Sequence, residues 1–131
     1  MLRKFLASFS LFFLLACSYP LHAQTCVVGA SGVAPTASLT FVPPTLNTDS
    51  TTIATPLTYN LYQSTTSGAE VKVASALKGS PVAVSTGLTP KSTVYWKISV
   101  VDVNGVESAL SNEVCKSFPA SIPGTVTITV S

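Results

Sequence analysis

Few residues of this chain have side chains suited to catalysis or metal binding. Its 131 residues include 7 basic residues, 5 acidic residues and one histidine, His22. Catalysis by a serine or threonine nucleophile needs a base beside the hydroxyl, yet His22 lies within a predicted export signal. Zinc sites are built largely from cysteine and histidine. The sequence therefore predicts neither a serine-type hydrolase nor a zinc centre.

Paired carboxylates are the remaining catalytic option. Asp102 and Glu107 flank one predicted hairpin, but glycosidase-type chemistry needs two acids on either side of a cleft. A tight hairpin tip offers no such cleft. The oxygen-rich stretch 47–50 lacks the additional acids of a calcium loop and is interpreted as a solvated turn. We therefore expect no enzyme, no cofactor and no metal.

The first 23 residues are predicted to be a signal peptide. A basic start precedes an apolar run over residues 5–16 and a cleavage region that ends at Ala23. The run is shorter than the roughly 20 residues that a membrane span needs. A second processing site stays open, because residues 14–17 could form a lipobox with Cys17 lipidated. We expect a secreted or periplasmic protein; the alternative is a lipid anchor in the bacterial envelope.

Removal of the signal leaves a chain with no net charge. Two of the 7 basic residues leave with it, so 7 − 2 = 5 lysines face the 5 acids. Nucleic-acid binding needs clustered lysine and arginine. We therefore expect no nucleic-acid partner, and membrane association only if Cys17 is lipidated.

Two cysteines, Cys26 and Cys115, remain after the signal. A pair of cysteines in an oxidising compartment favours a disulfide. The bridge would tie the start of the exported chain to its last predicted strand. The alternative is two unpaired thiols.

Short alternating runs between turn residues predict an all-β sandwich or barrel. In the longest run, 93–102, Trp96 should point into the core while Lys97 and Ser99 mark the solvent face. Asn104 and Gly105 form the strongest hairpin signal. The expected strands lie at 37–41, 57–62, 70–73, 81–85, 93–102 and from about 108 to 116.

Four motifs follow one another between residues 39 and 118: LTFVPP at 39–44, YNLY at 59–62, GLTPKST at 87–93, and DVNGVES at 102–108 with SNEV at 111–114. In this order they resemble a fibronectin type III domain of the kind found in bacterial and phage surface proteins. The resemblance implies an immunoglobulin-like sandwich of about seven strands. It assigns residues 24–36 to an N-terminal segment, 37–118 to the domain and 119–131 to a C-terminal extension.

The chain departs from the family pattern in two places. Val94 stands where a tyrosine normally closes the corner between the fifth and sixth strands, while Tyr95 comes one residue late and faces outward. The usual first strand is also hard to find, and only residues 25–28 could provide it.

The C-terminal extension holds one further strand-like segment. Residues 125–130 alternate valine or isoleucine with threonine and carry no charge. An open, uncharged strand of this kind invites aggregation. We expect it to pair with an edge of its own domain or with a partner molecule; the alternative is a frayed tail.

The predicted function is an exported, non-catalytic binding module that recognises a protein or a glycan. An alternative is a structural spacer or assembly subunit of bacterial or phage origin that associates through its C-terminal strand. The module would be a monomer, whereas the subunit would self-associate. Paired tyrosines on a sheet face could stack on sugars or anchor a protein, or only stabilise the sheet. The candidate binding surface comprises Tyr62, Tyr95, Lys97, Asp102, Asn104, Gly105 and Glu107.

Overall fold

The computed structural model describes residues 24–129. The predicted signal peptide, with His22 and the lipidation site Cys17, lies outside the described residues. Within the described part of the chain, no helix has the length and apolar character needed to cross a membrane.

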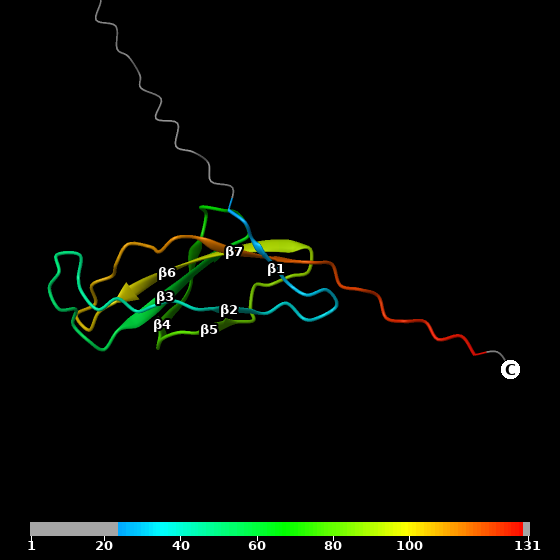
Figure 1. Ribbon diagram of the computed structural model, residues 1–131, viewed down its shortest axis with the longest axis horizontal. Helices are drawn as coiled ribbons and strands as arrows, with labels where there is room; N and C mark the ends of the chain where they lie inside the picture. The colour runs from blue at the N-terminus through cyan, green and yellow to red at the C-terminus, as the bar shows by residue number, and fades with distance from the viewer. Residues whose placement is uncertain (1–23, 130–131) are drawn as a thin grey trace, which may run out of the picture.

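The described chain forms two sheets that pack as a sandwich (Figure 1). The larger sheet has the order β1-β7-β6-β3-β4, and the smaller one pairs β2 with β5. This arrangement confirms the predicted all-β sandwich of about seven strands. The strands are β1 (Val27–Val28), β2 (Ala37–Leu39), β3 (Thr58–Ser64), β4 (Val71–Leu77), β5 (Val82–Val84), β6 (Ser92–Val101) and β7 (Val114–Phe118).

The core lies between the sheets, under the apolar side of β6. Val94 and Trp96 are 0% and 1% exposed, as the alternation of this strand predicts. The indole nitrogen of Trp96 donates a hydrogen bond of 2.8 Å to Gln63 Oε1 on β3. The one polar atom of this large side chain is thereby satisfied inside the protein. The remaining core residues are Ala37, Leu61, Val82, Val84 and Phe118.

The first strand is present but does not lie beside the second. β1 pairs in parallel with β7, with Val27 opposite Lys116. Two contacts hold it there: the disulfide one residue before it, and a hydrogen bond of 2.8 Å from Gly29 N to Ser117 O. Because β1 lies on β7, β2 pairs only with β5 and its other edge has no strand partner in residues 24–129.

The corner before β6 closes without the family's tyrosine. The hydroxyl of Ser92 donates a hydrogen bond of 2.6 Å to the carbonyl of Thr89. A serine therefore makes the backbone contact that a tyrosine hydroxyl usually makes at this corner.

The predicted return strand begins later than expected, at Val114 rather than about Ser108. The hydroxyls of Ser108 and Ser111 accept hydrogen bonds of 3.1 and 3.0 Å from the backbone N–H groups of Val100 and Ile98. These hydroxyls take the place of ladder carbonyls, so residues 108–113 follow β6 without forming a regular strand.

The C-terminal extension leaves the sandwich after β7. Residues 119–129 pair with no strand of the described chain, and Figure 1 shows them running away from both sheets. Val126 and Ile128 are each 83% exposed. Pairing with an edge of the same domain is therefore not found; pairing with a partner stays a prediction.

Candidate functional site

The outer face of the larger sheet carries a polar cluster centred on Glu107. The register places Asn60 opposite Ser99 and Tyr62 opposite Lys97, so these side chains share one face. Glu107 Oε1 accepts hydrogen bonds from Asn60 Nδ2 and the Tyr62 hydroxyl, both at 2.7 Å, and from the Ser99 hydroxyl. Its other oxygen lies 3.1 Å from Lys72 Nζ. One carboxylate thus satisfies polar groups of three neighbouring strands.

These donors change the acidity of Glu107. The hydrogen bond from Ser99, followed by those from Asn60, Tyr62 and Lys72, lowers the pKa of Glu107 to about 2. The carboxylate also covers Ser99, which is 1% exposed although the sequence predicted it on the solvent face. Ser99 and Asn60 depend on the ionised Glu107 for their side-chain hydrogen bonds.

The stability of the fold should therefore fall in acid. The pKa of Glu107 drops from an ordinary 4.5 to about 2 on folding, so its contribution is complete above pH 4.5 and is lost as the pH falls towards 2. Urea unfolding between pH 7 and 2 should show a flatter decline for Glu107→Gln than for the wild type. Tyr62→Phe removes a single donor and should give an intermediate profile. Identical profiles for all three proteins would contradict this role of Glu107.

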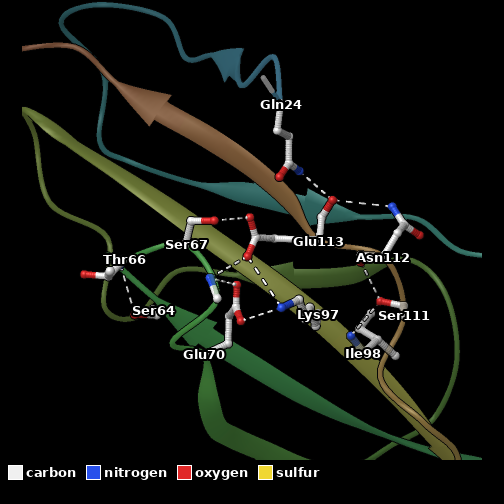
Figure 2. A network of polar contacts seen from close by, with 11 residues as sticks. Gln24, Ser64, Thr66, Ser67, Glu70, Lys97, Ile98, Ser111, Asn112 and Glu113 are labelled. Carbon is white, nitrogen blue, oxygen red and sulfur yellow. Dashed lines mark hydrogen bonds and ion pairs between the residues drawn. The ribbon is translucent and has the colours of Figure 1, made fainter. Parts of the chain in front are cut away.

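A second cluster ties the start of β7 to β6 and to the turn before β4 (Figure 2). Lys97 Nζ lies 2.9 Å from Glu70 Oε2 and 3.5 Å from Glu113 Oε2. The hydroxyl of Ser67 and the N–H of Gly68 each donate a 2.8 Å hydrogen bond to Glu113. Burial opposes the ionisation of Glu70, but its interactions with Glu113 and Lys97 outweigh burial and lower the pKa of Glu70 to about 2.

The structure brings four of the predicted binding residues to this face, but three of them, Tyr62, Lys97 and Glu107, are already engaged. The Tyr62 hydroxyl bonds to Glu107, and Lys72 Nζ lies 5.4 Å from the centre of the Tyr62 ring. Lys97 is held by its acids. Tyr95 is half-buried beside them. The face is largely filled by its own side chains, and ligand binding there stays a prediction.

The other three predicted residues form the hairpin turn. Asp102 Oδ1 accepts hydrogen bonds from the N–H groups of Asn104 and Val106, at 2.9 and 2.8 Å. Gly105 has φ +83°, a conformation that favours glycine. Asp102 therefore stabilises its own turn while Glu107 reaches onto the sheet, and the two acids do not form a pair.

The oxygen-rich stretch 47–50 closes on itself. Asp49 Oδ1 accepts hydrogen bonds from the N–H and hydroxyl of Thr51, at 3.0 and 2.6 Å. Across residues 24–129, no group of three or more histidine, cysteine, aspartate or glutamate side chains is arranged to hold a metal ion.

The predicted cysteine pair forms a disulfide. Cys26 and Cys115 are bridged, with their Cα atoms 4.8 Å apart. Cys115 lies opposite Tyr95 on β6, so the bridge sits on the outer side of the larger sheet and fastens the segment before β1 to the start of β7.

A hollow of the described chain is an open seam between the two sheets, which we call the seam groove. It has a volume of about 500 Å³. One wall is the free edge of β2 with its continuation, residues 37–42, and the other is formed by the segment 108–114. Trp96 and Ile98 of β6 line it between these walls. Exposed valines stand at its rim: Val27, Val42 and Val114 are 67%, 92% and 43% exposed.

Sequence reasoning missed this groove because it could not place the first strand. Had the first strand paired with β2, it would have covered the seam. The cysteine pair was the available signal, since a bridge from Cys26 to the last strand draws the N-terminal segment towards β7 and away from β2.

Comparison with known proteins finds similarity only at the level of solved structures. No family model and no curated protein matches the chain. Among solved structures, the chain is similar to the crystal structure of a Fn3-like protein from Clostridium thermocellum, at 28% identity with a TM-score of 0.49. The match covers 74% of this chain and 95% of that one.

The strand order and the disulfide define the class of protein: a small, disulfide-linked β-sandwich module.

Proposed function

We propose that this protein is an exported, non-catalytic binding module, and that it binds an extended, uncharged polypeptide segment in the seam groove. The observation that supports this proposal is the free edge of β2 beside an apolar groove of about 500 Å³. Ligand sites are typically concave and mostly apolar. The partner is thus a protein rather than a glycan, and no cofactor takes part.

Binding would occur by strand addition. An incoming segment pairs its backbone with a free sheet edge, while alternate side chains enter the groove and give specificity. In the seam groove, the incoming apolar side chains would meet Trp96 and Ile98. The rim residues Val42 and Val114 would be covered on binding, which explains why large apolar side chains stand exposed there.

The proposal places the protein in a secreted or periplasmic location. The disulfide between Cys26 and Cys115 favours an oxidising compartment. Lipidation of Cys17 remains the alternative, and it would tether the same module to the bacterial envelope. Intact mass of the protein from its native host distinguishes a chain that starts at Gln24 from one that starts at an acylated Cys17.

A peptide-display selection tests the proposed binding surface. The exported chain is the bait, and the selected peptides are then titrated against variants. We expect uncharged, alternating peptides whose affinity falls at least tenfold for Val114→Lys, because a lysine would enter the apolar seam. The matched control is Val103→Lys, which puts the same charge on the exposed hairpin turn outside the groove.

Two outcomes would overturn this function. One is a selection that yields no peptide sensitive to Val114→Lys. The other is binding that survives Val114→Lys but is lost in Tyr95→Ala, since this would place recognition on the outer face with Tyr62, Lys97 and Glu107.

A further inference from the structure

We infer that the seam groove of one copy takes up residues 125–130 of a second copy. Each copy then donates its C-terminal strand to the next copy in a head-to-tail chain, which we call strand exchange. This inference rests on the proposed function, because it names the occupant of the same groove. Three observations favour this occupant. Residues 125–130, which we call the donor segment, resemble an unpaired strand; they fit the groove in length and charge; and the chain leaves its own domain in a direction away from its own groove.

The donor segment has the pattern of a strand, but its described residues, 125–129, have no strand partner. Val126 and Ile128 alternate with threonines, and both are 83% exposed. An exposed, uncharged and β-prone segment is a template for pairing with another chain. Addition to a sheet edge would bury its apolar side and satisfy its backbone groups.

The donor and the groove match in length and in charge. Six residues in extended form span about 20 Å, and the groove wall along β2 also consists of six residues, 37–42. Among the described residues that line the groove, Lys97 and Lys116 are the charged ones. Lys97 is paired with Glu70, and Lys116 Nζ donates a 2.8 Å hydrogen bond to Thr36 O. Because both lysines already have partners within their own chain, the groove needs no acidic ligand, and an uncharged strand fits it.

The direction of the chain favours a second copy over the chain's own groove. The contact between Lys116 and Thr36 places the end of β7 beside the start of β2. To lie along its own β2, the tail would have to reverse direction within residues 119–124, where Pro119 and Pro123 restrict the backbone. Instead, residues 119–129 run away from the sandwich (Figure 1).

Strand exchange of this kind produces a defined form of assembly. Donor and acceptor are different surfaces of the same chain, so the contact is head-to-tail and each added copy offers a new donor and a new acceptor. The mass of the assembly should therefore rise with concentration rather than stop at a dimer.

Light scattering on the exported chain tests the exchange. We expect the mass of the wild type to rise above that of the monomer with concentration. Ile128→Asp should remain monomeric, because its carboxylate would enter the apolar groove. Thr127→Asp is the matched control: it carries the same charge on the opposite side of the strand and should assemble like the wild type.

A mixing experiment tests donor and acceptor separately. Ile128→Asp retains only the acceptor groove, and Val114→Lys retains only the donor strand. Each variant alone should be monomeric, and an equimolar mixture should form a 1:1 heterodimer that grows no further. If the two variants remain monomeric after mixing, the exchange is wrong.

Other outcomes separate this inference from the function on which it rests. If the wild type stays monomeric while selected peptides still bind the groove, the exchange is wrong and the binding function stands. If neither assembly nor groove-dependent peptide binding is found, both are wrong. A monomer in which hydrogen exchange shows residues 125–130 protected would mean that the tail occupies its own groove, which also overturns the exchange.

Discussion

Replacing Cys26 and Cys115 together by serine is expected to lower the free energy of unfolding by about 4–5 kcal/mol. The bridge joins residues 89 positions apart, and a long closed loop restricts the unfolded chain strongly. In the folded protein the bridge also holds β1 against β7, together with the pairing at Val27 and Val28, the bond from Gly29, and the bond from Gln24 Nε2 to Glu113 O just before β7. For a module of this size, such a loss is a large part of total stability.

Urea unfolding of oxidised wild type, reduced wild type and the double serine variant measures this effect. The reduced wild type should behave like the double variant, because both lack the same covalent link. Equal stability of all three proteins would show that the bridge contributes nothing. An effect confined to the double variant would instead assign the loss to the serine side chains.

The strand framework could be predicted from local patterns. In β6, alternation alone placed Val94 and Trp96 in the core, and the structure confirms both as buried. The periodicity of a strand specifies which side chains share a face. The corner could not be foreseen in this way, because the hydroxyl of Ser92 replaces a tyrosine through a single local hydrogen bond.

The environment of each face could not be predicted from the same patterns. Ser99 was assigned to solvent because its side chain is polar, yet it is buried beneath Glu107. Alternation identifies a face but not what folds over it. The contact depends on the irregular return segment before β7, where the hydroxyls of Ser108 and Ser111 accept hydrogen bonds from the backbone of β6 and the regular strand begins only at Val114. The acids of this segment, Glu107 and Glu113, thus contact the predicted binding residues Tyr62 and Lys97 and engage their polar groups.

The position of the first strand determines whether the candidate site is open, and the sequence does not specify this position. Both edges, β2 and β7, can accept a short strand, and the residues around Val27 favour neither. The disulfide selects β7, and this choice leaves β2 open beside the groove. A covalent contact between distant residues therefore determines the surface on which the proposed function depends.

Trp96→Ala is expected to lower the free energy of unfolding by about 3–5 kcal/mol. Trp96 is 1% exposed, so its loss leaves a cavity between the sheets and removes the donor that satisfies Gln63 Oε1. Tyr95→Ala is the matched control, because it truncates an aromatic side chain one residue away on the half-exposed outer face; it should cost only about 1–2 kcal/mol. Urea unfolding measures both variants. Equal losses would show that β6 does not separate core from surface, and Trp96, which lines the seam groove between its two walls, would then not belong to a packed apolar interior.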